Sequence, residues 1–114
     1  MTIEFSHDEV PSKLPPDAML CVFRVVQEAL QNALKHSSAT TMAVHLSGAS
    51  GGVTVTIADN GVGFDVDTAW RKGIGLSSIS ERVDEIGGAL EIQSRPGAGT
   101  RLTATVPLKE VVLN

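Results

Sequence analysis

The spacing of hydrophobic positions along the chain predicts two helices. Residues 17–35 are strong helix formers with no Gly or Pro among them, which predicts a long first helix. Ile79, Val83 and Ile86 recur at the i, i+4, i+7 spacing of a second helix. The segment 78–81 begins with Ser and ends with Glu, so it resembles a capping box at the start of that helix. A Gly-Gly pair then ends it.

Five shorter stretches alternate between apolar and polar residues, as strands do when one face packs on a core. They cover residues 3–5, 42–46, 53–57, 90–92 and 102–106. Glycine-rich segments at 48–52 and 95–99 predict the turns of two hairpins. The order of the elements predicts an α/β (α+β) two-layer sandwich, with helices on one face of a mixed, mainly antiparallel sheet.

Composition narrows the class of protein. The 114 residues have room for one domain, 1–114, and 42% of them are hydrophobic, which is enough to fill a core. A net charge of -4 argues against nucleic acid as the main partner, because a face that binds phosphate backbones is basic. The single cysteine, Cys21, excludes an internal disulfide and a cysteine-based zinc site. We expect no signal peptide, and no direct membrane contact from this domain.

One side of the long helix carries polar groups that suit a magnesium–phosphate site. At about 100° per residue, four polar residues fall within one sector: Glu28, Asn32, Lys35 and His36. Mg²⁺ prefers hard oxygen ligands and keeps several waters, so one amide oxygen and nucleotide phosphates would suit it. The alternative is a solvated helix face, on which Arg24 and Glu28 form only an i,i+4 ion pair.

The opposite side of the long helix is expected to pack against the sheet. Its residues are Val22, Phe23, Val26, Ala29, Leu30, Ala33 and Leu34. Cys21 and Val25 interrupt the polar side, where we expect them to be partly covered.

Two glycine pairs follow predicted elements. Asp59 ends a strand, where its carboxylate suits the exocyclic amine of adenine, while Gly61 and Gly63 would let the backbone approach a flat ring. The alternative is an ordinary turn, which Asp, Asn and Gly also favour. Gly73 and Gly75 run into the second helix, whose N-terminal N–H groups suit a phosphate. The dinucleotide fingerprint lacks its third glycine, and Gly-Lys, which a P-loop needs, occurs nowhere.

Four segments in this order resemble the motifs of the Bergerat, or GHKL, ATP-binding fold. Residues 28–36 resemble its N box, 59–64 its G1 box, 73–76 its G2 box, and 97–100 its C-terminal glycine–threonine segment. The resemblance covers about residues 3–108. The phrase Phe-Arg-Val-Val-Gln-Glu-Ala-Leu at 23–30 is similar to the catalytic ATP-binding domain of sensor histidine kinases, in the nitrate-sensor and desaturase-sensor subgroup.

This resemblance implies roles for the polar residues of the long helix. Asn32 would ligate Mg²⁺, and Glu28 would lie close to the metal and the γ-phosphate, so these two form the implied catalytic pair. Lys35 and His36 would contact phosphates.

The resemblance also implies the rest of the nucleotide site. Asp59 would bind the adenine amine, and Thr100 would support that contact through a water. The segment 64–72 would form the ATP lid, with Gly73 and Gly75 as its hinge. The remaining implied binding residues are Gly61, Gly63, Gly73, Gly75 and Leu76.

The implied reaction is transfer of the γ-phosphoryl group of Mg-ATP to a histidine on a partner dimerisation and phosphoacceptor domain, in two-component signal transduction. His7 is not expected to be that acceptor, because it sits between a short strand and a proline loop. We therefore expect a fragment of a longer sensor kinase that acts on a downstream response regulator. The domain is expected in the cytoplasm, whether or not its parent is anchored in a membrane.

Other functions of the same fold stay open. An anti-sigma-factor-type serine kinase phosphorylates a small antagonist protein, and the neighbouring sequence would distinguish it. A chaperone-like or mismatch-repair-like ATPase needs a longer lid and a transducer domain. A non-catalytic nucleotide-sensing module is the non-enzymatic alternative, and the intact Asn32 and Asp59 argue against it.

Overall fold

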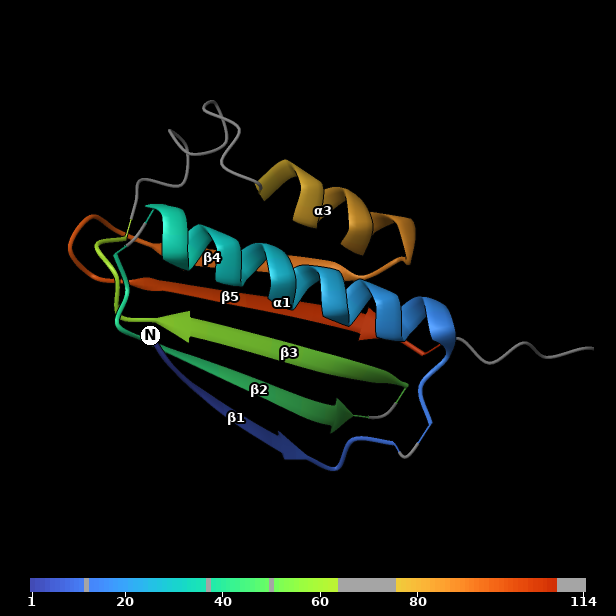
Figure 1. Ribbon diagram of the computed structural model, residues 1–114. Helices are drawn as coiled ribbons and strands as arrows, with labels where there is room; N and C mark the ends of the chain where they lie inside the picture. Colours follow the sequence, from blue (N-terminus) through green and yellow to red (C-terminus); the bar gives the residue numbers. More distant parts are fainter. Residues whose placement is uncertain (12, 37, 50, 64–75, 109–114) are drawn as a thin grey trace, which may run out of the picture.

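The structure is a computed structural model that describes residues 1–11, 13–36, 38–49, 51–63 and 76–108 (Figure 1). Its elements are β1 (Thr2–Asp8), α1 (Pro16–His36), β2 (Thr41–Ala49), β3 (Gly52–Asp59), α3 (Leu76–Glu85), β4 (Ala89–Ser94) and β5 (Thr100–Pro107). The strands form one five-stranded sheet in the order β1-β2-β3-β5-β4. β1 pairs with β2 in parallel and the other neighbours are antiparallel, which confirms the mixed, mainly antiparallel sheet.

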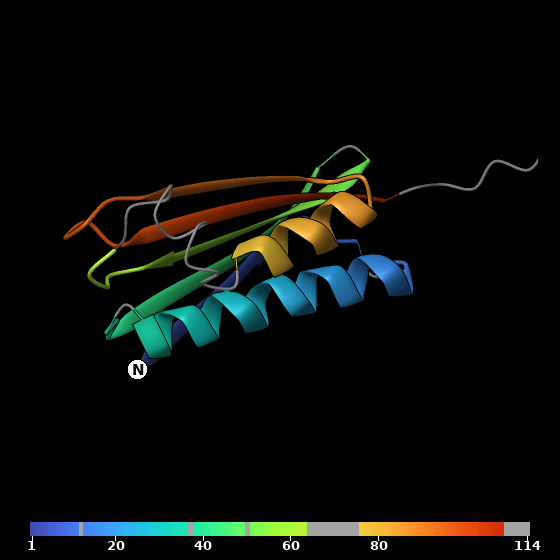
Figure 2. The ribbon, with the colours of Figure 1, turned by 90° about the horizontal axis from the view of Figure 1, so that it is seen from above.

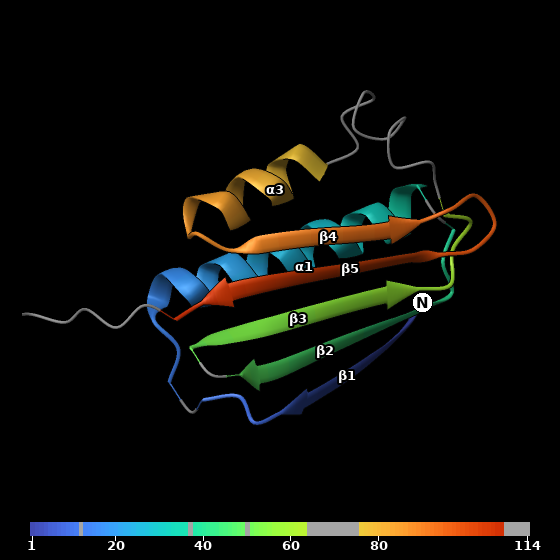
Figure 3. The ribbon, with the colours of Figure 1, turned by 180° about the vertical axis from the view of Figure 1, so that it is seen from behind.

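The molecule has two layers. Seen from above, α1 and α3 lie together on one face of the sheet (Figure 2). α1 packs over β5 and β3, and α3 packs beside it over β4 and β5. Seen from behind, the strands are in front of both helices, and no described segment covers this face (Figure 3). The predicted α/β sandwich is confirmed. Among the described residues, no helix is long and apolar enough to span a membrane.

The core lies between the helices and the sheet. Alternate residues of the two central strands fill it, as the alternation in the sequence predicts: Val53, Val55 and Ile57 of β3, and Leu102, Ala104 and Val106 of β5. α3 adds Ile79 and Val83, which are fully buried. Burial of this apolar surface holds the helices on the sheet.

The buried side of α1 differs from the predicted one. Val25 is fully buried and Cys21 is 6% exposed, although both were expected to be only partly covered. Phe23 and Leu34 were expected in the core, yet each is 59% exposed. The predictions for these four residues are therefore wrong. Ala33, which was also expected in the core, is buried.

The cause is the position of α3. A helical wheel gives directions within one helix and does not say where a second helix will pack. In the structure α3 lies against the side of α1 that carries Cys21, whose thiol donates a hydrogen bond to the carbonyl oxygen of Arg82 at 3.8 Å. Burial raises the pKa of this thiol, although the nearby charge of Arg82 opposes the shift. Compared with the prediction, α1 is therefore rotated about its axis, so that the side carrying Cys21 and Val25 faces the core.

The ends of several elements also differ from expectation. α3 begins at Leu76, so the segment 78–81 lies inside the helix and the predicted capping box is wrong. Its other end is as predicted: Gly87 has a φ of 77°, and the N–H of Gly88 donates to the carbonyl of Val83 at 2.9 Å. β1 is longer than expected and includes His7, which is therefore not on a helix.

Candidate functional site

Three of the four motif segments meet at one end of the molecule (Figure 1). β3 ends at Asp59 and β5 begins at Thr100, and the antiparallel register makes these two residues direct partners. β2 begins at the same end, because Met42 pairs with Asp59. α1 ends at His36, close in sequence to that start of β2, so its C-terminal end lies here too. The fourth segment, at 73–76, is described only at Leu76, the first residue of α3.

Asp59 and Thr100 lie on the face of the sheet that the helices cover. Side chains alternate between the faces of a strand, and Asp59 continues the inward series of Val55 and Ile57. Thr100 continues the inward series of β5 in the same way, two residues before the buried Leu102. Both polar side chains therefore stand where the apolar core ends, on the side of α1.

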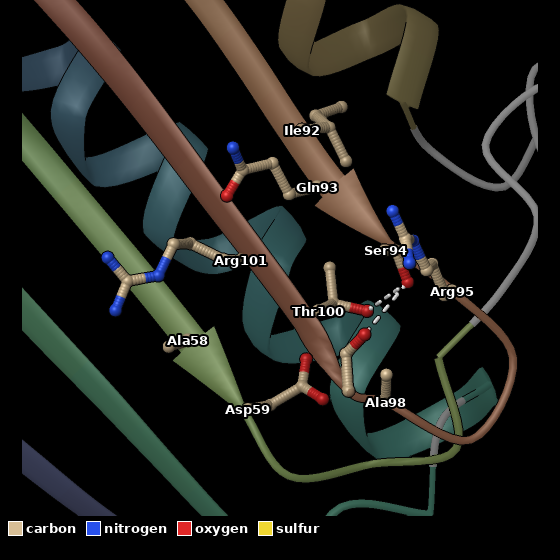
Figure 4. A pocket seen from close by; sticks show the side chains of 10 residues that line it. Ala58, Asp59, Ile92, Gln93, Ser94, Arg95, Ala98, Thr100 and Arg101 are labelled. Atoms are coloured by element: carbon tan, nitrogen blue, oxygen red, sulfur yellow. Dashed lines mark hydrogen bonds between the residues drawn. The ribbon is translucent and has the colours of Figure 1, made fainter.

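A cavity of about 610 Å³ opens at this end of β3, β4 and β5 (Figure 4). Its lining is formed by Ala58, Asp59, Ile92, Gln93, Ser94, Arg95, Ala98, Gly99, Thr100 and Arg101. One carboxylate oxygen of Asp59, Oδ1, accepts the N–H of Gly61 at 2.8 Å. The other oxygen makes no hydrogen bond to a described residue. Asp59 thus presents at the cavity one oxygen that is fixed and one that has no partner in the part of the chain that the structure describes.

Glycines let two backbone segments touch beside Asp59. Gly99 has a φ of 74°, and a Cβ built on it would overlap the carbonyl oxygen of Asp59. Gly63 has a φ of 68°, and a Cβ there would overlap the carbonyl oxygen of Arg95. The space that a side chain of Gly63 would need is therefore filled by the turn between β4 and β5, which is a reason for this glycine that the sequence does not reveal.

Ser94 ties the start of β5 to the end of β4, a role without a counterpart in the sequence-based predictions. Its hydroxyl donates to the carbonyl oxygen of Gly99 at 3.0 Å and hydrogen-bonds with Oγ1 of Thr100 at 2.9 Å (Figure 4). The Thr100 hydroxyl is therefore held in place at the cavity. A small polar residue at the inward end of a strand is the only sequence signal for this role.

The side chain of Asn60 connects the loop that follows β3 to the start of β2. Its Oδ1 accepts the N–H groups of Thr40 and Thr41, both at 2.9 Å. Its Nδ2 donates to Oγ1 of Thr40 at 2.8 Å. The signal in the sequence was an Asn between Asp and Gly, which is also the composition of any tight turn.

Two of the polar residues of α1, Glu28 and Asn32, are half-buried. Asn32 follows the fully buried Val25 by about two turns, so both lie on the same side of the helix. Glu28, one turn before Asn32, is likewise half-buried, whereas Lys35 is exposed. His36 is the last residue of the helix, and its side chain lies outside the described part. In the corrected orientation of α1, Asn32 lies on the same side as Val25, and Glu28 lies at the edge of that side.

The expected alternative, an ion pair between Arg24 and Glu28, does not form. Nη1 of Arg24 instead donates to Oε1 of Gln27 at 3.0 Å, and the buried Nε of Arg24 has no partner. Within the described residues, the carboxylate of Glu28 makes neither a hydrogen bond nor an ion pair. The helix face is therefore not accounted for by a simple surface ion pair.

The donor set fits a magnesium ion that is bound together with a nucleotide. Among the described residues, no group of three or more His, Cys, Asp or Glu side chains gathers in one place. A cation here would take an amide oxygen from Asn32, with Glu28 nearby, and its other ligands from phosphates and water. Mg²⁺ at nucleotide sites keeps several waters and takes few protein ligands beside the phosphates, so a single amide oxygen with a carboxylate nearby would be compatible with it.

Three predicted parts of the site lie outside the described residues: Gly73, Gly75 and the lid segment 64–72. Gly61 lies two residues after Asp59, and its N–H donates to the carboxylate of Asp59. The structure thus places Asp59 and Thr100 at one cavity, whereas Gly61, Gly63 and the described residues of α1 do not line it. Gly63 packs against the turn between β4 and β5, and the C-terminal end of α1 lies at the same end of the molecule.

Comparison with known proteins finds one protein family and relatives that are sensor proteins or histidine kinases. Residues 20–110 match the family described as histidine kinase-, DNA gyrase B-, and HSP90-like ATPase. The chain is 38% identical over 104 residues to the sensor protein VraS of Staphylococcus saprophyticus, an alignment that covers 91% of this chain and 30% of the relative. It is 35% identical over 106 residues to the signal transduction histidine-protein kinase/phosphatase DegS of Brevibacillus brevis, covering 93% of this chain and 28% of the relative.

Solved structures agree with the fold. The ATP binding domain of PrrB from Mycobacterium tuberculosis has a TM-score of 0.69 and 25% identity, and the match covers 95% of this chain and 82% of that one. The chain spans about 30% of the length of the curated relatives. The family match over most of its length, together with these relatives, shows that the chain belongs to the histidine kinase-, DNA gyrase B- and HSP90-like ATPases.

Proposed function

We propose that this chain binds Mg-ATP and donates the γ-phosphoryl group to a histidine on a partner dimerisation and phosphoacceptor domain. One observation carries the proposal: beside Thr100, at a cavity of about 610 Å³, Asp59 has a carboxylate oxygen with no partner among the described residues, at the end of the molecule that α1 shares. The names of the relatives, a sensor protein and a signal transduction histidine-protein kinase/phosphatase, support transfer to histidine.

Adenine would be recognised at the Asp59 side. The free oxygen of Asp59 accepts a hydrogen bond from the exocyclic amine, while Oδ1 stays bonded to the N–H of Gly61. Guanine has no donor at that position, so its binding would leave the carboxylate unpaired. Thr100, fixed by Ser94, supports the same contact through a water.

The phosphates would be bound where α1 ends. Asn32 ligates Mg²⁺ through its amide oxygen, and Glu28 lies close to the metal and the γ-phosphate. Lys35 and His36 contact phosphates, and so do N–H groups at the start of α3, where Leu76 is the first residue. Gly73 and Gly75 would bind nucleotide as the hinge of the lid. Bound magnesium neutralises phosphate charge as the phosphoryl group leaves. The residues of the chain position the nucleotide, which is most of what phosphoryl transfer requires.

The proposed biological setting follows from the same relatives. The acceptor histidine would belong to a phosphoacceptor domain of the same sensor protein, and the phosphoryl group would pass on to a response regulator. The domain would work in the cytoplasm. Its place in the nitrate-sensor and desaturase-sensor subgroup stays a prediction.

Calorimetric titration tests the nucleotide site. We expect ATP to bind more tightly with Mg²⁺ than without, and GTP to bind weakly. Asp59→Asn replaces an acceptor with a mixed amide and should lower ATP affinity on the order of 100-fold, as loss of a charged hydrogen bond does. Glu4→Gln, the same change on the exposed strand β1, is the control. Equal binding of ATP and GTP, or normal ATP affinity of Asp59→Asn, would refute the adenine assignment.

Transfer is tested with radiolabelled ATP and a separately purified phosphoacceptor domain of a sensor kinase. Label on histidine is lost in acid, whereas label on serine survives acid, so one treatment separates the proposed activity from a serine kinase of the same fold. We expect acid-labile label that disappears in Asn32→Ala. ATP binding without transfer to any acceptor would favour the nucleotide-sensing alternative.

A further inference from the structure

We infer that Asn60 is a positioning residue that sets the distance between the adenine end and the phosphate end of the site. This inference rests on the proposed function, because it assigns the two ends to one nucleotide. Asn60 itself is exposed and does not line the cavity. Its side chain acts on the site through the backbone that it holds.

The side chain of Asn60 is hydrogen-bonded to one short segment at the start of β2. Its amide oxygen accepts two N–H groups, from Thr40 and Thr41, and its amide nitrogen donates to the Thr40 hydroxyl. All three distances lie between 2.8 and 2.9 Å. Two N–H donors on one atom and a hydroxyl on the other fix which way the amide points. Three bonds to one dipeptide leave the loop little freedom to shift.

The position of these bonds along the chain gives them their importance. The ladder between β2 and β3 ends at the pair Met42 and Asp59. Beyond it, the chain after Asp59 and the chain before Met42 are joined by the side chain of Asn60 and by one backbone bond, from the N–H of Asn60 to the carbonyl of Thr41 at 3.3 Å. Asn60 therefore extends the connection past the last strand pair.

The two chains that Asn60 joins lead to opposite ends of the proposed nucleotide. Asp59, directly before Asn60, is the adenine residue. Thr40 follows the end of α1 at His36 by four residues, and α1 carries Asn32 and Lys35 for the metal and phosphates. A ligand that touches both ends is sensitive to the spacing between them, whereas a ligand that touches only one end is not.

This difference predicts a selective effect on affinity. Asn60→Ala should lower the affinity for Mg-ATP about tenfold and the affinity for adenosine less than about twofold. Asn60→Asp keeps an oxygen for the two N–H groups, and the Thr40 hydroxyl can donate to the carboxylate, so it should restore most of the Mg-ATP affinity. A purely structural role would not separate the two ligands.

The experiment measures the affinities of the 114-residue chain for adenosine and for Mg-ATP by calorimetry, with thermal melting by circular dichroism as the folding check. Ser6→Ala is the control, because it removes another exposed side-chain bond, the one between Ser6 Oγ and His45 Nδ1 at 2.7 Å. If Asn60→Ala does not fold, Thr40→Val removes one of the three bonds and should shift the ratio of the two affinities in the same direction.

Each outcome decides the question. A fall in Mg-ATP affinity with unchanged adenosine affinity, rescued by Asn60→Asp, supports the inference. Equal losses for both ligands, or no loss for either, overturn it while leaving the proposed function intact. If the unaltered chain binds neither ligand, the proposed function fails first, and the inference fails with it.

Discussion

The proposed nucleotide site has two walls, which are held in place by different forces. The wall that carries Asp59 consists of loops joined by hydrogen bonds, between Gly61 and Asp59, between Ser94 and Thr100, and between Asn60 and the first residue of β2. The wall that carries Asn32 is a single helix, fixed because its apolar residues pack into the core. Among the described residues, no hydrogen bond joins the side chain of Asn32 to the rest of the protein.

This difference indicates what each wall tolerates. Hydrogen bonds and close backbone contacts depend on single atoms, so the Asp59 wall should be sensitive to small changes near the turns. A helix held by burial keeps its place when an exposed or half-buried polar group is replaced. The chemistry of Asn32 and Glu28 can therefore be altered with little effect on stability, whereas backbone changes around Asp59 should lower it.

The largest effect on stability is expected when a methyl group is added to the wall that carries Asp59. Gly99→Ala would place a Cβ against the carbonyl oxygen of Asp59, at a φ of 74° that L residues rarely adopt. Because backbone would have to move, we expect a loss of about 3 kcal/mol in the free energy of unfolding. Urea denaturation followed by circular dichroism measures this loss.

Gly97→Ala is the matched control in the same turn. Gly97 also has a positive φ, 82°, but nothing lies within 4 Å of the position of its Cβ. This variant should cost only the backbone term, about 1 kcal/mol. If the two variants are equally stable, the close approach of Gly99 to Asp59 does not constrain this wall.

The helix wall is tested by comparing its two faces. Val25→Ala removes two methyl groups from a fully buried site and should cost about 2 kcal/mol of stability. Phe23→Ala removes a larger side chain that is 59% exposed and should cost less than about 1 kcal/mol. The order would be reversed if the face predicted from the helical wheel were the buried one, so the same denaturation experiment decides the orientation of α1.

The sequence predicts the sheet well because the alternation of β3 and β5 is a local pattern. Val53, Val55 and Ile57 show it without reference to any other part of the chain. The buried face of α1 is different. Phe23 and Cys21 are both apolar, and only the docking of α3, some sixty residues away, decides which of them is covered.

The candidate site shows the same division between local patterns, which the sequence predicts, and long-range contacts, which it does not. Asp59 and Thr100 belong to motifs that can be read in order along the chain, but their direct pairing depends on the register of two strands. The supporting roles of Ser94 and Asn60 were missed because their sequence neighbourhood is that of an ordinary turn. Asn60 has partners about twenty residues away, which no local pattern can indicate.

The smallest effect should come from the polar side of the helix wall. Asn32→Ala removes one proposed metal ligand without disturbing the packing, so we expect ATP affinity with Mg²⁺ to fall about tenfold. Without Mg²⁺, in the presence of a chelator, the affinity should be unchanged, and Gln31→Ala on the exposed side of α1 should behave as the unaltered chain does. Calorimetric titration measures all four combinations. An equal loss with and without the metal would mean that Asn32 contacts the nucleotide or supports the fold, and that magnesium is bound by other groups.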